Sequence, residues 1–145
     1  MARLHAARTS NISSFSGLDL TKPKIMGVIN VTPDSFSDGG ETFSLEDAVS
    51  RGRSMVAAGA DILDIGGEST RPGALPVSVD EECGRVVPVI ASLSQEGAIV
   101  SIDSRRAQVM AEAFSAGAAI VNDVSALTED SDAIQLISQS GMSVV

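Results

Sequence analysis

The sequence has few of the residues on which several classes of protein depend. Its 145 residues include one cysteine, one histidine, four phenylalanines and no tryptophan or tyrosine. A single cysteine, Cys83, excludes an internal disulfide framework and fits a reducing compartment. With so few aromatic residues, the core must be aliphatic. No apolar run is long enough to span a membrane, and no secretory apolar region follows the start. We therefore expect a cytoplasmic protein.

Basic residues are also scarce. Ten lysines and arginines face 19 aspartates and glutamates, which gives a net charge of -9. This balance argues against nucleic acid or an anionic membrane surface as a partner. Any bound phosphate must therefore be held by local features of the chain. The remaining composition, 43% hydrophobic and 20% charged, is typical of one globular domain.

Strand and helix patterns alternate along most of the chain. Residues 1–20 show no sustained period, which predicts a flexible amino-terminal leader or a short edge hairpin. From residue 21 onward we expect strands at about 24–30, 61–65, 99–103, 119–123 and, beginning a fifth, 143–145. Helices are expected from Ser44 as N-cap to a left-handed Gly59, and at about 78–95, 105–115 and 130–140.

Two residues are expected to disturb the regular geometry or packing of these helices. Gly52 weakens the first helix and predicts close packing on the sheet, and Pro88 predicts a kink or a break in the second. Arg105 and Arg106 are interpreted only as the start of the third helix.

This alternation predicts a parallel sheet with right-handed crossovers. Two architectures are compatible with this alternation, a (β/α)8 barrel and a doubly wound sheet. The first loop lacks the G-x-G-x-x-G fingerprint of a dinucleotide-binding sheet. The polar residues collect at the carboxyl ends of the strands, where barrels place their functional groups.

Four polar side chains share the predicted sheet faces at these strand ends. Counting in twos places Asn30, Asp64, Asp103 and Asn122 on faces that can point into one cavity. Carboxylates and amides read a ligand edge that combines hydrogen-bond donors and acceptors. The alternative is that these buried polar groups brace one another, or that Asp64 anchors a loop.

Two contiguous segments carry a family resemblance. Residues 26–40, MGVINVTPDSFSDGG, and residues 67–73, GESTRPG, resemble signatures of the dihydropteroate synthase family. The resemblance covers about residues 22–145 and implies the (β/α)8 TIM-type barrel of that family. Such barrels run to about 250 residues, so 21–145 are expected to form a half barrel of four βα units plus the start of strand five.

The resemblance implies an activity and roles for single residues. The reaction joins 6-hydroxymethyl-7,8-dihydropterin pyrophosphate to p-aminobenzoate, which gives 7,8-dihydropteroate and pyrophosphate. Asn30 would lie by the pyrophosphate and ligate Mg2+, Asp38 would place the first loop, and Arg71 would bind phosphate or carboxylate. The implied substrate-binding residues are Phe36 and Pro72 against p-aminobenzoate, Thr70 through its hydroxyl, and Asp103 and Asn122 on the pterin.

The family also has features beyond this sequence. Its later strands supply a further pterin-binding acid, a lysine and an arginine–histidine pair, and the full-length enzyme is expected to be a homodimer. The 145-residue chain is therefore predicted to be inactive alone, or nearly so. Two alternatives are a pterin-binding methyltransferase domain, which lacks the loop at 32–38, and a non-catalytic half-barrel interaction module.

Overall fold

The computed structural model describes residues 14–32, 44–69 and 76–145, which form a small hairpin and a larger parallel sheet. The hairpin pairs β1 (Ser14–Phe15) with β2 (Leu18–Asp19), and the sheet contains β3 (Met26–Asn30), β4 (Ile62–Gly66), β5 (Val100–Asp103), β6 (Ile120–Asn122) and β7 (Ser143–Val144). In the sheet, each strand pairs in parallel with the strand that precedes it in sequence.

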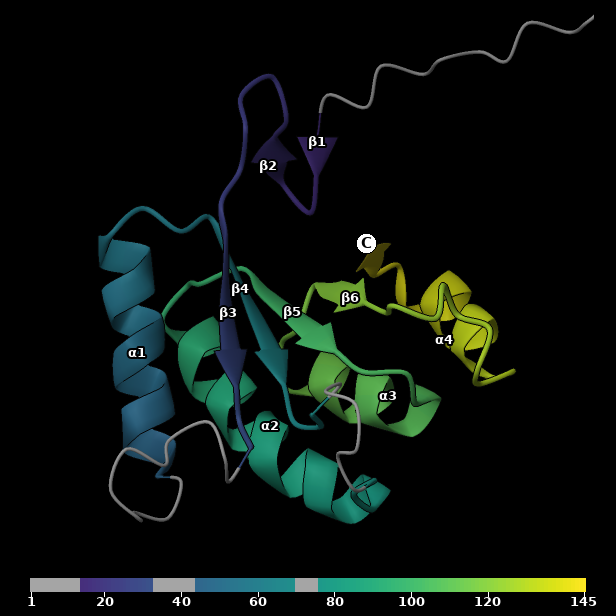
Figure 1. Ribbon diagram of the computed structural model, residues 1–145. Helices are drawn as coiled ribbons and strands as arrows, with labels where there is room; N and C mark the ends of the chain where they lie inside the picture. Colours follow the sequence, from purple (N-terminus) through teal and green to yellow (C-terminus); the bar gives the residue numbers. More distant parts are fainter. Residues whose placement is uncertain (1–13, 33–43, 70–75) are drawn as a thin grey trace, which may run out of the picture.

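A helix connects each pair of neighbouring strands in the sheet. These are α1 (Leu45–Ala57), α2 (Val79–Gln95), α3 (Ala107–Ser115) and α4 (Ala133–Ser140). Figure 1 shows α1, α2 and α3 along the same side of the sheet. A doubly wound sheet carries helices on both faces, whereas a barrel carries them outside only. The fold is therefore four βα units and a fifth strand of a (β/α)8 barrel, and the predicted fold class is confirmed.

The two faces of the sheet differ in character. The helix-facing side chains are aliphatic and belong to the buried core, among them Ile29, Leu63, Ile65, Val100 and Ile102. The opposite face, the lumen face of a barrel, carries the polar residues predicted for the site, and Val28 on it is 47% exposed. The alternation predicted from sequence is thus observed, because successive strand residues point to opposite faces.

Local signals fix the ends of the first two helices. The Ser44 side chain accepts a hydrogen bond from the Asp47 amide, and Ser78 accepts one from Glu81, so both predicted N-caps are confirmed. Gly59 follows α1 with φ of +104°, as expected for a left-handed glycine. Gly52 also lies in close contact, since a Cβ there would come within 2.8 Å of Leu93 on α2.

The predicted break at Pro88 does not occur, because α2 is continuous from Val79 to Gln95. Proline removes the amide that would bond to the carbonyl of Gly84, four residues earlier. Both residues are exposed, so water can satisfy that carbonyl. The third and fourth helices also begin later than expected, at Ala107 and Ala133.

The β1–β2 hairpin lies near the amino ends of the sheet strands (Figure 1). Ser16 and Gly17 form its turn, and both have positive φ, as a two-residue type I′ turn requires. The Ser16 hydroxyl donates a 3.4 Å hydrogen bond to the carbonyl of Ala119, next to β6. The short hairpin left open by the sequence is therefore present, at the end of the sheet opposite the predicted site.

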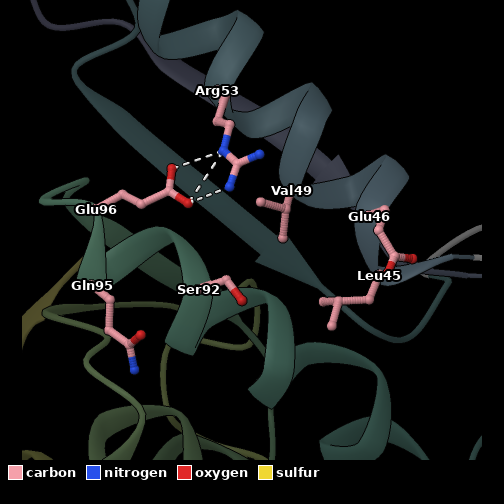
Figure 2. Close-up of a pocket in the computed structure, with 7 residues that line it drawn as sticks. All are labelled: Leu45, Glu46, Val49, Arg53, Ser92, Gln95 and Glu96. Atoms are coloured by element: carbon pink, nitrogen blue, oxygen red, sulfur yellow. Dashed lines mark hydrogen bonds and ion pairs between the residues drawn. The ribbon is translucent and has the colours of Figure 1, made fainter.

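The outer layer has a groove of about 350 Å³ between α1 and α2. Figure 2 shows Arg53 reaching across it to Glu96, with Nη2 2.6 Å from the carboxylate. Because both side chains are largely exposed, this ion pair contributes little to stability. Of the predicted site residues that the structure describes, Asn30, Asp103 and Asn122 do not line this groove. Across the described ranges, the helices are too short or too polar to traverse a lipid bilayer.

Candidate functional site

Three of the predicted site residues lie in one row across the sheet. Strand register pairs Asn30 with Gly66, Gly66 with Asp103, and Asp103 with Asn122. A Cβ built on Gly66 would lie 3.4 Å from Asp103 Oδ2 and 3.5 Å from Asn30 Oδ1, so both oxygens lie over this glycine. The absence of a side chain at Gly66 therefore leaves room for a ligand between the carboxylate and the amide.

Asp64 lies one residue pair deeper on the same face, where its register partner is Ser101. Its side chain is 2% exposed, and its Oδ2 accepts a 2.9 Å hydrogen bond from Asn122 Nδ2. This bond joins two strands, so Asp64 braces the polar row of the site. The sequence had left open whether it anchors a loop instead.

The Asp103 carboxyl lies in an unfavourable place for a negative charge. Its pKa is raised from 3.8 to about 6, mainly by burial and in addition by the nearby carboxylates of Asp64, Glu82 and Asp123, against a smaller opposing effect of Arg105. Such a shift at the end of a barrel strand is typical of a functional group. Near neutral pH, the side chain is mostly an ionised acceptor for ligand N–H groups.

Sequence reasoning missed a charge network beside this row. Arg105 forms ion pairs with Glu68 (3.1 Å) and Glu129 (2.8 Å), and Arg106 forms them with Glu68 (3.0 Å) and Glu82 (2.9 Å). Both arginines do stand at the start of α3, but their interpretation as a helix start alone was incomplete. Their partners lie 24 to 38 residues away in sequence, so local spacing could not reveal them.

The same network holds the segment that follows β4. Arg85 Nη1 donates a 2.9 Å hydrogen bond to the Gly67 carbonyl. The Glu68 carboxylate accepts hydrogen bonds from Arg105 and Arg106. Gly67 packs so closely on α2 that a Cβ would come within 2.8 Å of Val86. The base of the segment that contains the predicted Thr70, Arg71 and Pro72 is thus fixed to α2 and α3.

We expect Arg106→Met to destabilise the chain by about 3 kcal/mol at pH 7, since a buried ionised Glu82 would lose its partner. Burial already raises the pKa of Glu82, so lowering the pH to 5 should favour the neutral carboxyl and reduce the loss. Urea denaturation at both pH values measures the effect, with the exposed Arg51→Met as control. A loss of the same size at both pH values would contradict the role assigned to Glu82.

The loop after Asn122 is shaped by Asp123. Its carboxylate accepts hydrogen bonds from the Ser125 amide (2.8 Å), the Ser125 hydroxyl (2.9 Å) and the Leu127 amide (2.9 Å). Ala126 and Leu127 both have positive φ, which is unfavourable for residues other than glycine. The spacing Asp-x-Ser is a known turn signal, and it could have identified this role from sequence.

Helix α3 is capped from this same region. Arg106 occupies its N-cap position without a side-chain capping bond, and Asp130 Oδ2 accepts the 2.7 Å hydrogen bond from the Ala107 amide. This explains why the helix begins two residues later than the sequence predicted.

Five predicted site residues lie outside the described residues: Phe36, Asp38, Thr70, Arg71 and Pro72. Of the described site residues, Asn30 is exposed at the end of β3, and its amide oxygen is a type of ligand that Mg2+ can bind. Within the described part of the chain, histidine, cysteine and carboxylate side chains do not gather in threes as a metal site would require.

Comparisons with known proteins identify the family to which the chain is related. A family profile described as "Pterin binding enzyme" matches residues 26–145. The dihydropteroate synthase of Escherichia coli (strain K12) is 47% identical over 130 residues, which are 89% of this chain and 46% of that protein. The one from Synechocystis sp. is 50% identical over 116 residues, 79% of this chain and 40% of that protein.

Two solved structures of Xanthomonas albilineans dihydropteroate synthase are similar to the chain. The structure with 4-aminobenzoic acid has a TM-score of 0.81 at 48% identity, and covers 88% of this chain and 46% of its own. The complex with 7,8-dihydropteroate has a TM-score of 0.77 at 42% identity, with coverage of 88% and 46%. The chain thus spans about half the length of these relatives.

Proposed function

Because this chain belongs to the pterin-binding enzyme family, we propose that it supplies the first half of a dihydropteroate synthase site. The reaction would join 6-hydroxymethyl-7,8-dihydropterin pyrophosphate to p-aminobenzoate, with loss of pyrophosphate. The observation that carries the proposal is the row of Asn30, Gly66, Asp103 and Asn122 across neighbouring strands, supported by a raised Asp103 pKa.

Each described residue would act on a different part of the substrate. The Asp103 carboxylate would accept N–H groups of the pterin ring, and the Asn122 amide would bond beside it. Asn30 would lie nearest the pyrophosphate. The reaction is a substitution at the exocyclic methylene, so the protein would position the amine and stabilise the departing anion. No covalent nucleophile from the protein is needed.

Mg2+ is proposed as the cofactor, with the Asn30 amide oxygen as its protein ligand. When bound, the ion would neutralise charge on the leaving pyrophosphate. Arg71 is proposed to bind phosphate or carboxylate, Thr70 to contribute its hydroxyl, and Asp38 to place the first loop. Phe36 and Pro72 are proposed to lie along the p-aminobenzoate ring. The full-length enzyme is proposed to be a cytoplasmic homodimer that binds neither nucleic acid nor membrane.

Calorimetry with 6-hydroxymethylpterin, in the presence of pyrophosphate and Mg2+, tests the proposal. We expect binding by the 145-residue chain and at least a tenfold loss in Asn122→Ala, because a hydrogen-bonding group at the ligand would be removed. The exposed Gln135→Ala on α4 is the control and should bind as the parent does. Equal affinity of the Asn122→Ala variant and the parent would exclude the assigned row as the pterin site.

A further inference from the structure

The hydrogen bond between Asn122 and Asp64 determines how the amide of Asn122 is oriented. An asparagine amide can turn either its oxygen or its nitrogen toward a neighbour, and the two orientations have nearly the same shape. A carboxylate, by contrast, can only accept. Asn122 Nδ2 donates to Asp64 Oδ2 at 2.9 Å, so its Oδ1 is directed away from Asp64.

Asp64 is well placed to impose this orientation because it cannot easily move. It is 2% exposed on the interior strand β4, which is hydrogen-bonded to a strand on either side. Ser101, its register partner on β5, is fully buried. The second oxygen of Asp64, Oδ1, and the Ser101 hydroxyl lack hydrogen-bond partners among the described residues. Asp64 is therefore a rigid acceptor beneath the row.

The row that contains Asp103 and Asn122, one residue pair beyond Asp64, then presents hydrogen-bond acceptors to the cavity. Asp103 contributes a carboxylate, and the oriented Asn122 contributes its Oδ1, on adjacent strands at the same register position. Two neighbouring acceptors complement a ligand edge with two neighbouring donors, such as an amino group beside a ring N–H. An edge with a carbonyl in place of the amino group would face repulsion between acceptors.

We propose that Asp64 is a positioning residue that sets the ligand preference of the site by fixing the Asn122 amide. This inference rests on the proposed pterin site and deepens it. Asp64 acts through Asn122 and selects a ring with an amino donor over its oxo counterpart. The residue would thus contribute to specificity from one layer below the ligand.

The test compares two ligands that differ at one group, pterin (2-amino) and lumazine (2-oxo), by calorimetry. The parent should bind pterin more tightly. In Asp64→Asn, the introduced amide can donate or accept, so Asn122 can turn, and the pterin-to-lumazine affinity ratio should fall about tenfold. Glu112→Gln, the same chemical change on exposed α3, should leave the ratio unchanged. Equal losses for both ligands in Asp64→Asn would overturn the proposal.

A double variant distinguishes positioning from a purely structural role. Asp64→Asn combined with Asn122→Asp keeps the net charge and the hydrogen bond, with donor and acceptor exchanged. The group that faces the ligand is again an acceptor, so the preference for pterin should return. Failure to recover the preference, in a double variant that unfolds at the parent's urea midpoint, would overturn the proposal.

A measurement without ligand separates this inference from the proposed function. In the free chain, the Asn122 side-chain N–H bonded to Asp64 should resonate downfield of its partner proton in NMR spectra, and Asp64→Asn should reduce the separation. The signal is assigned by its loss in Asn122→Ser. Absence of pterin binding by the parent would count against the proposed function, whereas an unchanged Asn122 signal in Asp64→Asn would overturn the positioning role.

Discussion

Asp103→Asn is expected to make the chain more stable at pH 7 and at the same time unable to hold a pterin tightly. The ionised carboxyl is disfavoured by burial and by Asp64, Glu82 and Asp123, which together raise its pKa to about 6. A neutral amide of the same shape avoids that cost, so the free energy of unfolding should rise, by up to about 3 kcal/mol. Pterin affinity should fall tenfold or more because a charged acceptor is lost.

The pH dependence gives an independent check of the same group. Between pH 3.8, the usual pKa of an aspartate, and about 6, the folded chain holds a proton on Asp103 that the unfolded chain has released. The contribution of Asp103 to stability is therefore fully present below pH 3.8 and is lost as the pH rises through 6. Urea midpoints across this range should converge at low pH for the parent and Asp103→Asn.

Asp130→Asn provides a control of opposite sign. Hydrogen bonds from the Ala107 and Asp132 amides hold the pKa of Asp130 below its usual range, so its ionised form stabilises the fold. Neutralising it should lower stability near pH 7, with a loss that fades as the pH falls through the Asp130 pKa. If Asp103→Asn also lowered stability at pH 7, the unfavourable environment described for Asp103 would be wrong.

The second large effect concerns turnover. We expect the purified 145-residue chain to form 7,8-dihydropteroate at no more than about one thousandth of the rate of a full-length relative, because loss of even one charge-stabilising group costs 10²–10³ in rate. The chain spans about half of those relatives. Asn30, Asp103 and Asn122 would bind the substrate, while the groups that the resemblance assigns to later strands would be missing.

Product formation by chromatography, with both substrates and Mg2+, measures this rate. The matched comparison adds the carboxyl-terminal half of the Escherichia coli relative, either in trans or fused after Val145. Activity should appear only in the combined sample, and Asn122→Ala should reduce it. Turnover near that of the full-length enzyme by the 145-residue chain alone would refute the prediction.

Much of the fold follows from short-range patterns in the sequence. Period-two alternation placed Asn30, Asp103 and Asn122 on one face, and serine caps fixed the starts of α1 and α2. These signals depend on neighbours a few residues apart, which a sequence displays directly. Pro88 misled because its effect depends on whether the helix face is exposed, a tertiary property.

The charge network and the role of Asp64 could not be predicted in the same way. Arg106 contacts Glu68 and Glu82 because α2, α3 and the segment after β4 pack together. Asn122 donates a hydrogen bond to Asp64, which lies 58 residues earlier in the sequence. Charged side chains near a helix start have many candidate partners in an acidic chain. Which of these candidate partners is contacted depends on how neighbouring strands and helices pack in three dimensions.

The strand order of the sheet has a consequence for synthesis on the ribosome. Each strand from β4 to β7 pairs with the strand made just before it, so each of these strands finds its first partner already synthesised when it emerges. At roughly 5–20 residues per second, each new βα unit emerges within several seconds of its neighbour. The chain can therefore assemble progressively from its amino end, one βα unit at a time.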